Sequence, residues 1–113
     1  MADPEVIGEC RQIASTWSTT LRALAKEERL LIVLWLAETE CTVRELEKVT
    51  GLSQSLVSYH LAALREAGLV TASPSGRSNR YRLAHADLDE LASLLGRLKP
   101  MQEAEETTER NAA

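Results

Sequence analysis

The chain has 113 residues and a formal net charge of −4, which fits a single domain and excludes a uniformly basic nucleic-acid binder. It has two cysteines, no apolar run of membrane-spanning length and no basic-then-apolar leader. We therefore expect a cytoplasmic protein with reduced thiols. The charge is unevenly distributed, because residues 53–82 hold four arginines and one glutamate, a local charge of +3 that leaves −7 elsewhere. This basic island predicts docking on phosphate.

Two helices are predicted first along the chain. Residues 1–12 are expected to form a flexible, partly helical segment, and an amphipathic helix is predicted to start near Ile13. The apolar stripe of this helix consists of Ile13, Trp17, Leu21 and Leu24. A second helix is predicted from Glu27 to about Ala37. Because residues 30–37 are apolar nearly all round, we expect this helix in the buried centre of a bundle.

A pair of capped helices follows. Thr42 and Glu45 have the Thr-x-x-Glu spacing of a capping box, and Gly51 is the residue type that ends a helix in the left-handed conformation. Ser53 is expected to cap the next helix, predicted over residues 53–67. The inward side of that helix consists of Val57, Leu61 and Leu64. Two short helices separated by Thr-Gly-Leu-Ser are typical of a helix-turn-helix.

After Gly68 the pattern changes to that of a β-hairpin. Residues 69–72 and 80–83 are short strand-like runs, and the turn-forming residues 73–79 place Arg77 at a flexible tip. A hairpin directly after a helix-turn-helix predicts a winged helix-turn-helix, mainly α with a small β-hairpin, in the order α-α-α-α-β-β-α.

The last helix is predicted over residues 86–98, before Pro100. Its leucines have a heptad-like spacing and are Leu88, Leu91, Leu95 and Leu98. Since the earlier helices already supply a core, this seam favours contact with a partner chain. The alternative is that it packs on its own core. The folded domain is thus expected over residues 13–99, and the acidic tail, residues 100–113, is expected to be disordered.

The outer face of the helix over residues 53–67 indicates DNA binding. It carries short, uncharged hydrogen-bonding groups rather than the glutamates and lysines of an ordinary solvated face. Gln54, Ser55 and Ser58 are predicted to read base edges in the major groove. The full set of residues predicted to contact DNA is Thr42, Ser53, Gln54, Ser55, Ser58, Tyr59, His60, Arg65, Arg77 and Arg80.

Within this set, Tyr59, His60 and Arg65 fit contacts to phosphate or sugar, and Arg77 and Arg80 fit contacts to the backbone or a minor groove. An alternative stays open for each group. His60 would instead be an internal residue that packs beside the preceding helix and bonds a backbone carbonyl, and the arginines would serve only as solubilising charges.

The helix pair and the hairpin also resemble a known family. The matching runs are Leu-Ser-Gln-Ser-Leu-Val-Ser-Tyr-His-Leu at 52–61, Leu-Arg-Glu-Ala-Gly-Leu-Val at 64–70, Gly76-Arg77 and Tyr81-Arg82-Leu83. They closely resemble ArsR/SmtB-type winged-helix transcriptional repressors. The resemblance implies a homodimer, joined by its first and last helices, that binds double-stranded operator DNA as an inverted repeat until an effector loosens the complex. The residues expected at the dimer contact are Ile13, Trp17, Leu21, Leu88, Leu91, Leu95 and Leu98.

Many members of that family sense metal ions at one of two sites, and the resemblance is incomplete at both. The first site is a Cys-x-Cys pair, but Thr42 and Arg44 occupy the thiolate positions here, with Cys41 one residue early. A soft metal needs several thiolate or imidazole ligands, and Cys41 with Cys10 would supply two.

The second family site pairs an acid and a histidine near the start of the last helix with a histidine and an acid three turns later. His85 and Asp87 lie near the first pair in reversed order, whereas Leu98 and Met101 replace the second pair. A rearranged transition-metal site for nickel or zinc at His85 and Asp87, completed by a neighbouring acid, stays open. The alternative is that these two residues cap the helix.

Thiol redox or sulfide sensing by Cys10 and Cys41 is a third effector hypothesis, and it requires close thiols, one with a lowered pKa. An organic ligand, a protein partner or no effector stay open as well. An enzyme is not expected, because the chain lacks a glycine-rich phosphate loop and its two histidines lack an evident nucleophile partner. The alternative function is a winged helix that binds only protein. The residues facing outward favour DNA.

Overall fold

The computed structural model describes residues 3–98, without the side chains of residues 85–87. Its elements are α1 Pro4–Leu24, α2 Glu27–Glu38, β1 Cys41–Thr42, α3 Val43–Thr50, α4 Gln54–Glu66, β2 Val70–Ser75, β3 Ser78–Leu83 and α5 His85–Gly96. The predicted helix-turn-helix followed by a hairpin is confirmed. In residues 3–98 no helix is both long and apolar enough to cross a membrane. The predicted acidic tail lies outside the described residues.

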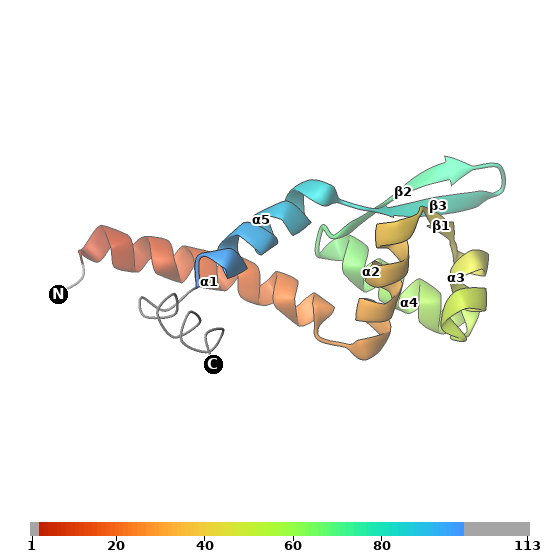
Figure 1. Cartoon of the computed structure of the whole chain (residues 1–113), viewed down its shortest axis with the longest axis horizontal. Coiled ribbons are helices and arrows are strands. Elements are labelled where there is room, and N and C mark those ends of the chain that lie inside the picture. Colours follow the sequence, from red (N-terminus) through yellow and green to blue (C-terminus); the bar gives the residue numbers. More distant parts are fainter. Residues whose placement is uncertain (1–2, 99–113) are drawn as a thin grey trace, which may run out of the picture.

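The elements fall into two regions (Figure 1). Helices α1 and α5 lie side by side at one end of the molecule, and α3, α4 and the hairpin lie at the other, with α2 packed among them. One apolar core holds the second region together. Its buried members are Ala23, Ile32, Leu36, Cys41, Leu46, Val57, Leu61, Leu64, Leu69, Val70 and Leu83.

The helix-turn-helix is built by the capping residues that the sequence indicated. The Thr42 hydroxyl accepts a hydrogen bond from the Glu45 amide, and the Glu45 carboxylate accepts one from the Thr42 amide, which completes the capping box. Gly51 ends α3 with φ at 75°, and the Ser53 hydroxyl caps α4 by accepting from the Leu56 amide. These three predictions are confirmed.

The hairpin is longer and tighter than predicted. β2 and β3 pair antiparallel from Val70↔Leu83 to Ser75↔Ser78, so the connection is only Gly76-Arg77 rather than residues 73–79. Gly76 has φ at 64° and Arg77 does not have positive φ, as a type II′ turn requires. Because β2 is an edge strand, it tolerates Pro74. β1 adds a third strand beside β3, and its two residues are too few for a sequence pattern.

Helix α1 begins at Pro4, so the predicted start near Ile13 is wrong. Asp3 caps the helix by accepting from the Glu5 amide at 3.0 Å, and Pro4 occupies the first turn, where its missing N–H does no harm. Residues 4–12 are all exposed, and apolar periodicity detects only a buried face. The Asp-Pro-Glu sequence was the signal that would have found this start.

Helix α2 is not the buried centre of a bundle. Ile32 and Leu36 are buried on its inner side, but Leu34 is 66% exposed and Leu30 is 47% exposed in this single chain. Its inner side also holds Arg29, which is only 8% exposed. The helix therefore buries one side only, and a charged residue lies on that side.

Candidate nucleic-acid interface

The outer face of α4 has the composition and exposure that the sequence predicted. Its inward residues Val57, Leu61 and Leu64 are at most 1% exposed. On the opposite face, Gln54, Ser55, Ser58 and Ala62 are exposed, and Tyr59 is 58% exposed. Because this face carries no charge, the groups available to a ligand are short donors and acceptors at the start of the helix.

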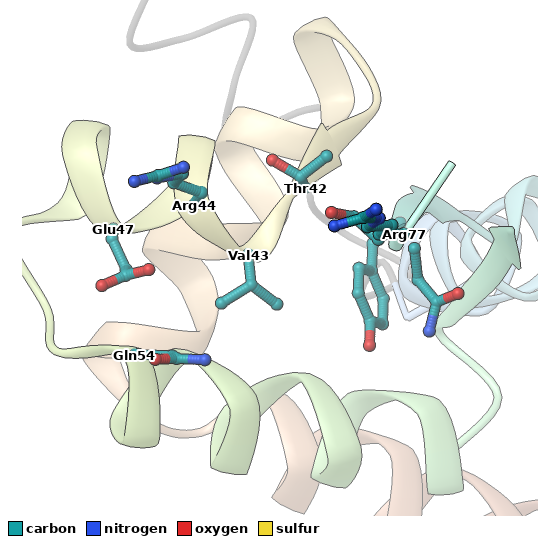
Figure 2. Close-up of a pocket in the computed structure, with 9 residues that line it drawn as sticks. Thr42, Val43, Arg44, Glu47, Gln54 and Arg77 are labelled. Atoms are coloured by element: carbon teal, nitrogen blue, oxygen red, sulfur yellow. The ribbon is translucent and has the colours of Figure 1, made fainter. Parts of the chain in front are cut away.

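A hollow of about 540 Å³ lies between α3 and the hairpin and is bordered by the first residue of α4. Figure 2 shows Val43 of α3 and Gln54 of α4 facing it from opposite sides, with Arg77 on the hairpin side. Its lining residues are Thr42, Val43, Arg44, Glu47, Gln54, Arg77, Ser78, Asn79 and Tyr81. Arg44 and Arg77 are exposed, so two arginines from different elements border one concave, polar surface.

Arg44 was missing from the residues predicted to contact DNA. Its position was interpreted only as one at which a metal-binding cysteine of the family is replaced. The available signal was that Arg44 lies off the apolar positions of α3, since Val43 packs against the core and Leu46 is buried in it.

Arg80 is held by carboxylates. Its guanidinium lies 3.5 Å from Glu45 and 3.9 Å from Glu40, while Arg82 lies 3.9 Å from Glu40. These contacts join β3 to the segment that starts α3. Arg80 is therefore less available to phosphate than the sequence suggested, and Arg82, whose side chain is 61% exposed, is the more accessible arginine of β3.

His60 lies on the inner side of α4 and is 2% exposed, which overturns its predicted contact with phosphate. Its Nδ1 accepts a hydrogen bond from Arg29 Nε at 3.2 Å, so its partner belongs to α2 and is not a backbone carbonyl. Burial, and then the Arg29 charge, lower the pKa of His60 below its usual value. His60 is thus a neutral, internal residue of the helix that carries the outer face.

The α1–α5 surface only partly matches the predicted seam. Leu91 is 6% exposed and Leu88 packs on the core of its own chain, so the first half of the seam is used internally. Leu95 and Leu98 are 51% and 66% exposed. A hollow of about 430 Å³ between the two helices is lined by Cys10, Ile13, Ala14, Trp17, Ser18, Leu21, Leu94, Arg97 and Leu98. The predicted residues of α1 therefore face Leu94 near the end of α5 and the residues that follow this helix.

The two cysteines are apart within one chain. Cys10 is exposed in the N-terminal half of α1, whereas Cys41 is buried in β1, and Figure 1 shows these two segments at opposite ends of the molecule. Burial, and then the Glu45 charge, raise the pKa of the Cys41 thiol. Among the described side chains, no group of three or more His, Cys, Asp or Glu residues could hold a metal ion. The His85 and Asp87 side chains lie outside the described part.

Known regulators match the chain in sequence. Residues 26–72 match the family described as bacterial regulatory protein, arsR family. The transcriptional repressor SmtB of Mycobacterium tuberculosis is 44% identical over 87 residues, which are 73% of this chain and 64% of SmtB. This chain thus spans slightly less than two thirds of SmtB. The transcriptional activator HlyU of Vibrio cholerae is 40% identical over 78 residues, 69% of this chain and 72% of HlyU.

Solved structures match in fold as well. Reduced HlyU from Vibrio cholerae has a TM-score of 0.69 at 36% identity, over 80% of this chain and 95% of that one. The homodimeric winged helix-turn-helix DNA-binding domain Mb0332 from Mycobacterium bovis has a TM-score of 0.65 at 29% identity, over 85% of this chain and 84% of that one. The chain belongs to the arsR family of bacterial regulatory proteins.

Proposed function

We propose that the chain is a homodimeric transcriptional regulator that binds an inverted-repeat operator through α4 and the hairpin. One observation carries this proposal. The uncharged, hydrogen-bonding outer face of α4 lies beside a concave surface bordered by Arg44 and Arg77. A helix that enters the major groove needs short polar groups toward the bases and cations toward the flanking phosphates.

Gln54, Ser55 and Ser58 are the proposed base readers. A glutamine side chain can pair with both edge groups of adenine, and serine hydroxyls can donate to or accept from any base edge. All three residues lie in the first half of α4, which is the part of a recognition helix that approaches the bases. Its backbone N–H groups at this end add a positive potential for phosphate.

The proposed contacts to the DNA backbone come from several elements. Arg44 of α3, Arg77 of the hairpin tip and Arg65 near the end of α4 are exposed cations. Tyr59 adds an exposed hydroxyl beside the reading face. Cations spread along one surface hold a protein in register on the duplex without selecting sequence. Arg80 is left out of this set because its guanidinium already forms ion pairs with Glu40 and Glu45.

The proposed homodimer uses α1 and α5. The Cα radius of gyration is 18.3 Å, well above the roughly 13 Å of a compact chain of about 100 residues. The exposed apolar residues Leu21 and Leu95 lie on α1 and α5, the helices that extend away from the core, and the exposed Leu98 follows α5. A second copy would cover them, and the matching domain of Mycobacterium bovis is homodimeric. Two-fold symmetry would then present two α4 helices to two half-sites.

Two effector proposals accompany this function. One is nickel or zinc at His85 and Asp87. The other is thiol oxidation or sulfide sensing at Cys10 and Cys41. Within one chain Cys10 would react first, because it is exposed, whereas Cys41 is buried and has a raised pKa. HlyU was solved in a reduced form, and this property of that protein motivates testing oxidants and polysulfide on the present one.

The function is tested by selecting duplexes from a random DNA pool with the wild-type protein and measuring binding by fluorescence anisotropy. A Gln54→Ala, Ser55→Ala double variant should lose about tenfold or more in affinity for the selected duplex, with little change for a scrambled one. Arg77→Ala should weaken both duplexes and reduce the salt slope by about 1. Failure of the pool to converge on any sequence would instead favour the module that binds only protein.

A further inference from the structure

A charged side chain lies buried in the middle of this fold. Arg29 is 8% exposed on the inner side of α2, between the core residues and α4. Burying a guanidinium costs free energy unless hydrogen bonds replace its water. Among the described residues, no ion pair joins Arg29 to a carboxylate, so its hydrogen bonds to neutral groups are what compensate for burial.

The contacts of Arg29 reach two other helices. Its Nη1 donates to the Ala23 carbonyl in the last turn of α1 at 3.3 Å, and its Nε donates to His60 Nδ1 in the middle of α4 at 3.2 Å. The same guanidinium lies 5.7 Å from the ring centroid of Tyr59, the residue next to His60. One side chain of α2 thus bonds both the end of α1 and the centre of α4.

The imidazole of His60 must be neutral for this arrangement. Because Nδ1 accepts from Arg29, the proton of the neutral ring lies on Nε2. In the described part of the chain, Nε2 is buried without a hydrogen-bond partner, and Glu28 Oε2 lies 3.8 Å from it. Glu28 and Arg29 are adjacent on α2, and Lys26, the N-cap residue of the same helix, is a third charge that acts on the ring.

We propose that Arg29 and His60 form a positioning pair that sets the rotation and axial position of α4 relative to α1. This inference rests on the proposed function. Apolar contacts such as those of Val57 and Leu61 hold α4 in place without direction, whereas a hydrogen bond fixes distance and angle. Rotating α4 would move its base-reading face, so a change in α1 at the dimer contact reaches the DNA through this pair.

The test separates the two nitrogen positions of His60. His60→Asn keeps an acceptor near Nδ1, and His60→Gln removes that acceptor while placing an amide near Nε2. We expect His60→Gln and Arg29→Met to lower the ratio of affinities for selected and scrambled DNA by about tenfold. We expect His60→Asn to stay within about threefold of wild type, since an amide oxygen also accepts from Arg29.

The matched control is Ile32→Val, which removes a methyl from a fully buried residue of the same helix. It should lower Tm without changing the affinity ratio, as a purely structural role predicts. Where His60→Gln is too unstable to assay, a double-mutant cycle with Arg29→Met and His60→Leu replaces it, because each change removes the hydrogen bond and leaves an apolar side chain. Additive effects on the ratio would overturn the pair.

The two proposals fail in different ways. If wild type does not discriminate the selected duplex from the scrambled one, the proposed function fails and this inference falls with it. Both variants are assayed at a temperature below their Tm. If wild type discriminates between the duplexes and Arg29→Met and His60→Gln have the same affinity ratio as wild type, only the positioning pair is wrong.

Discussion

The carboxylate of Glu45 accepts two hydrogen bonds from Thr42, one from its amide at 3.1 Å and one from its hydroxyl at 3.0 Å. The same carboxylate lies 3.5 Å from Arg80 of β3. Thr42 itself pairs with Arg80 in the sheet. The start of α3 and the hairpin are therefore joined by strand pairing and by ion pairs beside the hollow between them.

Replacing Thr42 should destabilise the domain through its cap. Thr42→Ala removes the hydroxyl that accepts from the Glu45 amide and donates to its carboxylate, and we expect a loss of about 1 kcal/mol in the free energy of unfolding. Thr42→Ser keeps the hydroxyl and serves as the control. Urea unfolding followed by circular dichroism measures both, and equal midpoints for the two variants would exclude the cap as a stabilising feature.

Glu45 should make stability depend on acid pH. Hydrogen bonds from the Thr42 amide and then its hydroxyl lower the pKa of Glu45. A lowered pKa in the folded state means that the unfolded chain binds the proton first, so stability present near neutral pH is lost as pH falls through that range. Glu45→Gln should be less stable than wild type at neutral pH, and its stability should change less between pH 3 and 6. Urea unfolding midpoints measured over this range test this, and the same pH dependence in both proteins would contradict it.

His60 should add a second pH dependence, at higher pH. Its pKa is lowered by burial and then by Arg29, so below the ordinary histidine range the unfolded chain binds a proton that the folded chain excludes. Stability should therefore fall as pH drops from about 7 toward 5. His60→Asn should remove this slope, because asparagine does not titrate. The only other histidine gives the control, and His85→Asn should keep the slope.

Much of the helix-turn-helix formed by α3 and α4 was predictable from the sequence, because helix caps and turns are local signals. Thr42, Gly51 and Ser53 each have a geometric requirement that only a few residue types meet, and the structure places them as expected. The outward face of α4 followed from helical spacing once its apolar side was known. Sequence periodicity therefore located the candidate site, although it did not find Arg44.

The errors have a common physical origin. Periodicity separates the two faces of a helix, but it does not tell which neighbour covers a face. His60 was assigned to DNA and Leu91 to a partner chain, and both are covered by their own chain. The contact that buries His60 joins residues 31 positions apart, and nothing local to either residue indicates it.

The two thiols should react at different rates. Cys10 is exposed on α1, whereas Cys41 is 4% exposed and its pKa is raised by burial. Because the thiolate is the reactive form, Ellman's reagent should label one thiol per chain quickly and the second only as the chain unfolds. Cys10→Ser should abolish the fast phase and Cys41→Ser should leave it. Fast labelling of Cys41 in the folded protein would show that β1 opens readily.

A charge on the exposed half of α5 should separate the proposed dimer. Leu95 is 51% exposed in one chain and lies on the face that a second copy would bury, so Leu95→Glu would place a carboxylate in an apolar contact. Sedimentation equilibrium should show a shift from dimer to monomer while the far-ultraviolet circular dichroism stays unchanged. Affinity for a two-half-site operator should fall more than affinity for one half-site, because only the dimer binds both at once.

The control for this variant is Val49→Glu, since Val49 is 41% exposed on α3, away from α1 and α5. It adds the same charge at a similarly exposed apolar position and should leave the dimer intact. Leu91→Ala serves a different purpose, because Leu91 is already 6% exposed within one chain. It should lower the stability of the chain by about 2 kcal/mol or more without first dissociating the dimer. Dissociation caused equally by Leu95→Glu and Val49→Glu would place the contact elsewhere than on α5.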